Sequence, residues 1–415
     1  MDLTPLFPRY IQPRLLEALE DTPVILIHGA RQTGKTTLAK SIGSSRGYSY
    51  LSFDREETAR AAIDDPVGFT ARLPEYVILD EVQRVPTLFS ALKMSVDENR
   101  RPGRFLLTGS TNLLAMPTLS DSLAGRMEII RLGPLTQAEI EGTRPRLIEK
   151  MFEGNFRIRN ERERLGNLSE RIVRGGFPAA LGRPTEERRE RWYNEYIEAI
   201  ITKDIRSFDE IREHDIMPRL LRLIAAQTAS LRNISDLSTP FGLSRPTIEK
   251  YAALLERLFL VETLPPWYTN RSQRTIKTPK LHISDTGLGC TLAGVDSEGL
   301  RSSPSILGQM LETFVYQELR RQSAWGERPV AFHHFRTRDR VEVDLVLEGR
   351  NGEIVGVEVK ASGGISTGDF RGLRKLQELA GDRMKCGVLL YGGASTLPFG
   401  ENLWGMPISS LWEDD

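Results

Sequence analysis

The stretch VILIHGARQTGKTT, from Val24 to Thr37, decides the fold because a short apolar run passes directly into a glycine-rich turn. Residues Gly29 to Thr36 fit the pattern G-x-x-x-x-G-K-[ST], which follows a buried strand and opens a helix. Glycines at both ends let successive backbone N–H groups face inward, and the helix N-terminus adds partial positive charge. An ordinary glycine turn before a helix is the alternative, but the motif in this context predicts a phosphate-binding loop.

The residue types in this loop indicate ATP with Mg²⁺ as the bound cofactors. Lys35 is expected to reach the β- and γ-phosphates and to act in catalysis, and the Thr36 hydroxyl is expected to ligate the metal. Arg31 lies inside the loop and is a candidate for a contact to the nucleotide of its own chain. The predicted nucleotide-binding residues of the loop are Gly29, Ala30, Arg31, Gln32, Thr33, Gly34, Lys35, Thr36 and Thr37.

Two carboxylates follow a second apolar run, Tyr76 to Leu79. A buried parallel strand would deliver Asp80 at its carboxyl end, where ligands bind in such sheets. Asp80 is predicted to hold Mg²⁺ through water, and Glu81 to orient or deprotonate the attacking water. The alternative is a strand that ends in two solvated acids, which the upstream loop makes less favoured.

A third run, Phe105 to Leu107, is followed by Thr-Gly-Ser-Thr-Asn, so Ser110 is predicted to contact the γ-phosphate or the attacking water. A turn that satisfies its own backbone explains such a segment equally well. Arg126 is a candidate catalytic arginine finger, given to a neighbouring subunit, although a lone arginine is more often a surface charge.

Short apolar runs alternate with helical patterns through the first third of the chain, which predicts a parallel sheet covered on both faces. The remaining predicted strands of this sheet are 48–53 and 129–130. From about residue 133 to 192 the sequence is rich in Arg and Glu, which predicts helices with a solvated face.

These motifs together resemble those of the AAA-type ATPases. More narrowly, the chain resembles prokaryotic ATP-binding proteins that join an AAA ATPase to a C-terminal domain of unknown function. The resemblance implies an ATP-binding core, a helical lid and assembly into a homo-oligomer, with a ring as one form. It is carried by Gly29 to Thr37, Leu79-Asp80-Glu81, Leu107 to Ser110, Gly125-Arg126, Leu132 to Leu135, Gly175-Gly176-Phe177-Pro178 and Thr202 to Ile205.

Residues 234–261 read as helix, turn and helix, followed by a strand, and resemble a winged-helix domain. Between residues 240 and 282 there are seven basic and three acidic residues, a net charge of +4. The whole chain has 56 basic and 56 acidic residues, so DNA binding would need such a local patch. A protein-interaction module or a solvated basic loop is the alternative. The predicted DNA-binding residues are Arg245, Lys250, Arg271, Arg274, Lys277 and Lys280.

Two alternating runs, 341–347 and 354–360, predict a β-hairpin. A turn centred on Asn351 would pair Asp344 with Glu358, and two carboxylates that close favour a cation such as Mg²⁺ between them. Lys360 lies on the same face as Glu358 and would position or activate a water.

This spacing resembles the PD-(D/E)XK nuclease family, and Glu312 would match the family's helix glutamate. Val343 stands where the family has proline. A hairpin with one charged solvent face is the alternative, and such folds also persist as binding modules without cutting.

The expected fold class is α/β: a P-loop AAA-type parallel sheet with a helical lid, a winged-helix middle and a C-terminal α/β restriction-endonuclease-like domain. The expected divisions are 1–135 for the ATPase core, 136–215 for the lid and linker, 216–285 for the winged-helix-like domain and 286–415 for the nuclease-like domain. Two cysteines, Cys290 and Cys386, exclude a disulfide framework and a cysteine-built zinc site. Without a long apolar run or a signal peptide, we expect a cytoplasmic protein that does not enter membranes.

The combined expectation is an Mg²⁺-dependent ATP hydrolase that couples ATP binding and hydrolysis to DNA binding or processing, in repair, recombination or defence. One alternative is a nucleotide-controlled switch that acts on a protein partner and carries an inactive nuclease-like tail. The other is an ATP-gated nuclease. The sequence identifies no protein partner.

Overall fold

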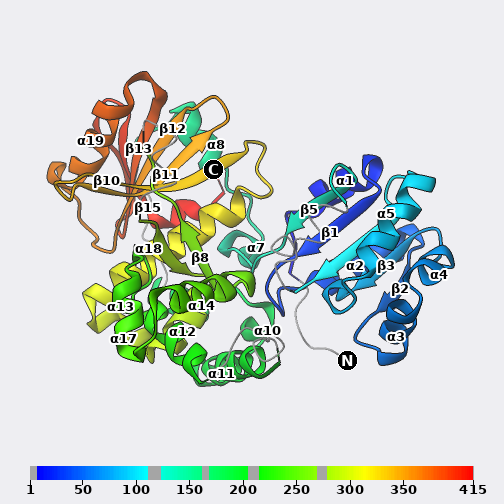
Figure 1. Ribbon diagram of the computed structural model, residues 1–415. Coiled ribbons are helices and arrows are strands. Elements are labelled where there is room, and N and C mark those ends of the chain that lie inside the picture. The colour runs from blue at the N-terminus through cyan, green and yellow to red at the C-terminus, as the bar shows by residue number, and fades with distance from the viewer. Residues whose placement is uncertain (1–6, 111–122, 161–167, 204–214, 269–277, 415) are drawn as a thin grey trace. The chain divides into compact units, whose positions relative to one another are not determined.

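The computed structural model describes residues 7–110, 123–160, 168–203, 215–268 and 278–414 (Figure 1). The chain divides into two compact units. The N-terminal unit comprises Pro8–Pro134 with Arg257–Phe259, and the C-terminal unit contains Leu135–Glu256 and Leu260–Asp415. The predicted division near residue 135 thus falls at the limit between the units, whereas those near 215 and 285 fall inside the C-terminal unit. No helix among the described residues has the length and apolarity needed to cross a bilayer.

The N-terminal unit is built on a five-stranded sheet in the order β2-β3-β4-β1-β5, and every neighbouring pair is parallel, as predicted. The central strands read as continuous apolar runs because both of their faces are buried. The strands are β1 (Val24–His28), β2 (Ser49–Ser52), β3 (Val77–Asp80), β4 (Phe105–Gly109) and β5 (Met127–Arg131). The helices are α1 (Gln12–Asp21), α2 (Lys35–Arg46), α3 (Glu56–Asp64), α4 (Pro66–Ala71) and α5 (Leu88–Glu98), with a 3₁₀ turn η1 (Val82–Arg84).

Parallel register brings the carboxyl ends of three strands to one edge of this sheet. Phe105 of β4 pairs with Val24 of β1 and with Val77 of β3, so the three strands start and end nearly level. The phosphate loop, the acidic pair and the polar turn after β4 therefore all leave the sheet at the same edge.

The C-terminal unit begins with short helices, as the Arg- and Glu-rich composition predicted. A capping box between Thr136 and Glu139 starts the first of them. The Gly-Gly-Phe-Pro turn is fixed by its surroundings: the N–H of Gly176 donates to Oδ2 of Asp285 at 2.8 Å. The elements are α7 (Gln137–Glu141), α8 (Leu147–Glu153), β6 (Arg159–Asn160), α9 (Leu168–Arg174), α10 (Pro178–Leu181) and α11 (Glu186–Lys203).

The middle of the C-terminal unit runs helix, strand, helix, helix, strand, strand. The strands form an antiparallel sheet in the order β7-β9-β8. The predicted helix–turn–helix is present, with Gly242 in the left-handed conformation between the two helices. The elements are α12 (Ile216–Ala226), β7 (Ser230–Leu231), α13 (Ile234–Ser238), the 3₁₀ turn η4 (Thr239–Phe241), α14 (Arg245–Arg257), β8 (Val261–Leu264) and β9 (Lys280–Ile283).

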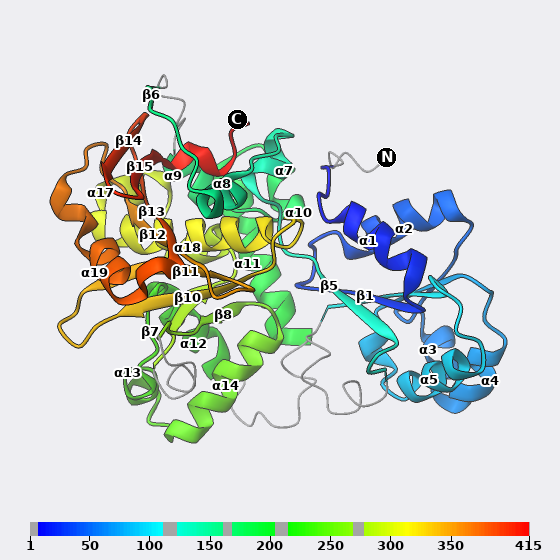
Figure 2. The same cartoon turned by 90° about the horizontal axis from the view of Figure 1, so that it is seen from above.

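The last part of the chain contributes to a seven-stranded mixed sheet in the order β10-β11-β12-β13-β15-β14-β6 (Figure 2). Helix α19 packs on β11, β12 and β13, and α18 packs on β12. The strands are β10 (Val330–Arg336), β11 (Glu342–Gly349), β12 (Ile354–Lys360), β13 (Met384–Tyr391), β14 (Ser395–Gly400) and β15 (Leu403–Pro407). The helices are α16 (Thr286–Ala293), α17 (Ser297–Ser302), α18 (Pro304–Gln322) and α19 (Arg371–Ala380), with 3₁₀ turns η5 (Thr367–Phe370), η6 (Gly381–Arg383) and η7 (Ile408–Leu411).

The predicted hairpin has the predicted register. Leu345 pairs with Val357 and Val346 with Gly356, which centres the turn on Asn351. Asp344 and Glu358 are the next positions outward in that register.

Two glycines of the C-terminal unit give a matched test of this packing. A Cβ on Gly372 of α19 would lie 1.9 Å from the backbone oxygen of Glu342 on β11, whereas a Cβ on Gly308 of α18 would meet nothing within 4 Å. We expect Gly372→Ala to lower the free energy of unfolding by about 1–3 kcal/mol through overpacking. Gly308→Ala should raise it by about 0.5–1 kcal/mol, because alanine loses less backbone entropy in a helix.

Denaturant unfolding of the two variants measures this difference. Equal stability of the two variants would show that α19 does not pack closely on β11.

Candidate functional site

The loop after β1 needs glycine at both ends. A Cβ on Gly29 would lie 2.1 Å from the backbone oxygen of Leu132, so no larger residue fits there. Gly34 has φ +92°, in the region that favours glycine, and caps the first turn of α2. The loop therefore packs tightly against the segment after β5, and α2 begins directly after it.

Lys35, the first residue of α2, is buried against the loop. Only 4% of the residue is exposed, and its Nζ donates to the carbonyl oxygens of Gly29 at 3.0 Å and Ala30 at 2.7 Å. The ammonium thus lies next to the N-terminus of α2, and both carry positive charge. This concentration of positive charge suits a phosphate anion.

Arg9, which the sequence analysis did not single out, also contacts the loop. Its guanidinium donates to the carbonyl oxygens of Thr33 and Gly133, both at 2.8 Å. Thr33 in turn donates its hydroxyl to the carbonyl oxygen of Ala30 at 3.0 Å. No sequence pattern pointed to Arg9, which lies 20 residues before Gly29, because only the fold brings it to the loop.

Asp80 accepts hydrogen bonds from four hydroxyl groups of one helix and two strands, the longest from Ser52 Oγ to Oδ2 at 3.5 Å. Thr36 Oγ1 donates to Oδ1 at 2.7 Å, Tyr50 OH donates to Oδ2 at 2.8 Å, and the hydroxyl of Thr108 also donates to Oδ1. The carboxylate is 4% exposed. Thr36 and Asp80, 44 positions apart in sequence, are therefore in direct contact. Hydroxyl and carboxylate oxygens are hard donors, so this pair fits Mg²⁺.

Tyr50 is a second residue that the sequence analysis missed. Burial, together with its hydrogen bond to Asp80, raises the pKa of Tyr50 to about 12, so the phenol stays protonated and donates. The Lys40 ammonium lies 3.8 Å from the centre of the Tyr50 ring. The only sequence signal was its place on β2, beside the strand that ends in the acids.

Glu81 lies beside a polar pair. Its carboxylate accepts from Ser110 Oγ at 3.0 Å and from the Gln83 side chain, which also donates to Ser110 Oγ at 2.9 Å. Glu81 has φ +60° and ψ +46°, a conformation that non-glycine residues rarely adopt and that clusters at active sites. Ser110 was predicted for this site and Gln83 was not.

His28 ends β1 directly before the loop. Burial, with a smaller effect of the nearby cations Arg131 and Lys35, lowers the pKa of His28 to about 4. The imidazole is therefore neutral near pH 7 and adds no charge to the loop.

Arg126 does not lie with these residues. It precedes β5, whose first residue Met127 pairs with Val24 at the amino end of β1, while the phosphate loop follows the carboxyl end. Its Nε is 2.5 Å from Oδ1 of Asp97. Five strand residues at about 3.3 Å each separate it from the loop of its own chain.

The predicted DNA-binding residues divide into three groups. Arg245 and Lys250 are exposed on α14. Arg271, Arg274 and Lys277 lie outside the described residues. Lys280 is 3% exposed, so its side chain is not available at a surface.

Of the predicted nuclease-like residues, Glu312 and Asp344 lie near one ammonium, which belongs to Lys280 and not to Lys360. Lys280 Nζ lies 2.6 Å from Oε1 of Glu312 and 3.6 Å from Oδ1 of Asp344. Burial, and to a smaller extent the charge of Asp344, raises the pKa of Glu312 to about 8. The same two causes also raise the pKa of Glu358. Lys360 instead pairs with Oδ1 of Asp369 at 2.8 Å.

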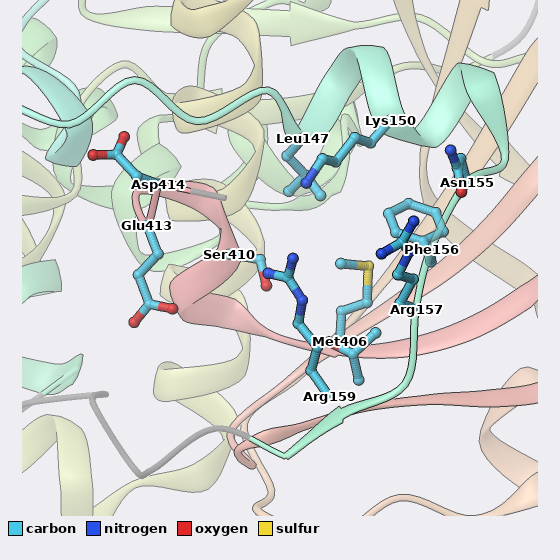
Figure 3. Close-up of a pocket in the computed structure, with 11 residues that line it drawn as sticks. Leu147, Lys150, Asn155, Phe156, Arg157, Arg159, Met406, Ser410, Glu413 and Asp414 are labelled. Atoms are coloured by element: carbon cyan, nitrogen blue, oxygen red, sulfur yellow. The ribbon is translucent and has the colours of Figure 1, made fainter.

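A pocket of about 250 Å³ in the C-terminal unit holds none of these residues (Figure 3). It lies between α8, the segment before β6, and η7. Its wall carries the basic side chains of Lys150, Arg157 and Arg159 and the acidic side chains of Glu413 and Asp414. The mixed charges indicate no single ligand class.

Three segments of the chain match known families. Residues 21–141 match an AAA domain, residues 165–299 a domain of unknown function (DUF8612) and residues 307–411 another domain of unknown function (DUF4143). Two uncharacterized proteins, Rv2008c of Mycobacterium tuberculosis and Mb2031c of Mycobacterium bovis, are each 29% identical over 402 residues. The match covers 96% of this chain and 83% of either relative.

Solved structures with a distant likeness include the Walker-type ATPase PABY2304 of Pyrococcus abyssi, with a TM-score of 0.37 and 15% identity, covering 69% of this chain and 96% of that one. They also include the RuvB Holliday junction branch migration motor of Thermotoga maritima, with a TM-score of 0.31 and 17% identity over 62% and 90% of the two chains. Likenesses this remote say nothing about individual site residues. The AAA match covers β1 to β5 and the whole loop, so this part of the chain is similar to AAA domains, and the last part is similar to a domain of unknown function.

Proposed function

We propose that the chain is an Mg²⁺-dependent ATPase whose nucleotide cycle is coupled to DNA binding. The observation that carries the proposal is the 2.7 Å hydrogen bond between Thr36 and Asp80, beside a lysine buried in the phosphate loop. Two segments far apart in sequence contribute the hydroxyl and the carboxylate that a magnesium–triphosphate site requires.

The residues divide the chemistry between them. Thr36 and Asp80 would hold Mg²⁺, which would neutralise charge on the phosphates. Lys35 would bind phosphate oxygens in place of its carbonyl partners when a nucleotide is bound. Glu81, held by Ser110 and Gln83, orients or deprotonates the attacking water.

Arg126 acts on the nucleotide of a neighbouring copy in this proposal. Its position at the amino end of the sheet supports a role in trans, because the loop of its own chain lies at the opposite end. Homo-oligomeric assembly is therefore part of the proposed mechanism.

DNA binding is assigned to the middle of the C-terminal unit. The order of α12, β7, α13, α14, β8 and β9 supports a winged helix, in which α14 is the second helix of the helix–turn–helix. Arg245 and Lys250 are exposed on this helix, whereas Ile248 and Leu255 are buried. The two basic side chains would contact the phosphate backbone.

The end of the chain is proposed to have a PD-(D/E)XK-like fold. A helix, three antiparallel strands, a helix and a parallel strand follow one another from α18 to β13, which supports this proposal.

Lys35→Ala should reduce ATP turnover by about 100-fold or more, since one preorganised cationic donor at the transferring phosphate is lost. Steady-state phosphate release measures this. An alanine at Arg60, an exposed residue of α3 that pairs with Glu56, is the control and should retain turnover. Turnover by Lys35→Ala equal to that of the parent would remove the phosphate-loop assignment.

Tyr50→Phe should raise the Mg²⁺ concentration for half-maximal ATPase activity by about 10–100-fold, because a hydroxyl that orients the metal-binding Asp80 is removed while the ring stays. Tyr48→Phe is the matched control, since the Tyr48 hydroxyl donates to Gly103 and not to Asp80. An unchanged Mg²⁺ requirement in Tyr50→Phe would show that this hydrogen bond does not position the carboxylate.

Arg245→Ala and Lys250→Ala should each weaken DNA binding equally for all sequences and lower the slope of log affinity against log salt by about 1. Fluorescence anisotropy at several salt concentrations measures both effects. Arg301→Ala, on the exposed surface of α17, is the control. If the parent protein binds no DNA at low salt, the nucleotide-controlled protein switch becomes the better account.

A further inference from the structure

Three acidic residues of the C-terminal unit, Glu312, Asp344 and Glu358, form a cluster, and a buried lysine lies beside it. Lys280 opens β9 and is 3% exposed, yet its side chain reaches α18 and β11. Its Nζ lies 2.6 Å from Glu312 and 3.6 Å from Asp344. Segments from three parts of the C-terminal unit therefore meet around one ammonium.

This one ammonium does not give every carboxyl oxygen of the cluster a partner. Oε2 of Glu358 is buried and has no hydrogen-bond partner among the described residues. The second oxygen of Asp344, Oδ2, accepts only the Val359 N–H, at 2.9 Å, among the hydrogen bonds of the described chain. Buried carboxyl oxygens without full partners would be open to a cation if the ammonium were removed.

A divalent cation does not fit beside the lysine. The ammonium already takes an oxygen of Glu312 and approaches Asp344, and its own charge repels a metal. Consistently, no group of three or more His, Cys, Asp or Glu side chains within the described ranges is arranged to hold a metal. The predicted water-positioning lysine, Lys360, lies against Asp369 instead.

We propose that Lys280 is the resident cation of this acidic site, and that Glu312, Asp344 and Glu358 become a divalent-cation site only when its ammonium is removed. The chain's own lysine excludes metal from the nuclease-like centre. This role is independent of ATP hydrolysis, and it explains how acids in nuclease-like spacing can be kept without metal-dependent cutting.

The test is Mn²⁺ binding to the whole chain without nucleotide, measured by isothermal titration calorimetry and electron paramagnetic resonance. Asp344→Asn distinguishes this cluster from metal bound near Asp80. We expect the parent protein and Asp344→Asn to bind the same number of ions. Lys280→Met should gain one site, which the double variant Lys280→Met/Asp344→Asn loses again.

Lys360→Met is the matched control, because it removes a lysine of the same predicted constellation whose ammonium pairs with Asp369; it should gain no site. If Lys280→Met does not fold, Lys280→Met/Glu312→Gln makes the same test, since an amide replaces the carboxylate that lost its ammonium. An added site in the Lys280 variants, at which Mn²⁺ binds about tenfold or more tightly than it does to the cluster in the parent protein, supports the proposal.

Two results would overturn it. The first is a metal site in the parent protein that Asp344→Asn removes, which would mean that metal and lysine coexist. The second is the absence of any gained site in the folded Lys280 variants, which would make the cluster an ion pair of structural importance alone.

Discussion

The N-terminal unit depends on the hydrogen bonds that meet at the Asp80 carboxylate. Hydroxyl groups from α2, β2 and β4 converge on it, so one side chain fixes the relative positions of the phosphate loop, the neighbouring strand and the polar turn. A buried carboxylate needs such partners, because burial without them would carry a large desolvation cost. The same convergence places a hydroxyl and a carboxylate side by side at the carboxyl edge of a parallel sheet, where such folds bind ligands.

Local patterns were enough to predict the parts of this site. The strand, loop and helix from Val24 to Arg46 follow one another in sequence, and the glycine spacing and apolar run specify them without help from the rest of the chain. Arg9, Tyr50 and Gln83 were not predictable in this way. Each reaches the site through strand order or tertiary packing, and none belongs to a motif with fixed spacing.

The C-terminal unit shows the same distinction. The register of the hairpin around Asn351 was predicted, because alternation and a short turn determine it, although β11 extends to Gly349, beyond the predicted end at residue 347. The partners of the two lysines were not. Lys280 was expected at a basic surface and is buried against Glu312, whereas Lys360 was expected beside the acids and contacts Asp369. A lysine side chain is long and flexible, so its partner depends on packing that charge patterns do not encode.

The central claim, that the loop after β1 and the Asp80 carboxylate form a single magnesium–nucleotide site, is tested most directly by a crystal structure with Mg²⁺ and a non-hydrolysable ATP analogue. The account predicts the triphosphate inside the loop, Lys35 moved from the carbonyl groups of Gly29 and Ala30 to phosphate oxygens, and the metal next to Thr36 and Asp80. A nucleotide bound elsewhere, or a lysine that keeps both carbonyl contacts with nucleotide present, would contradict it.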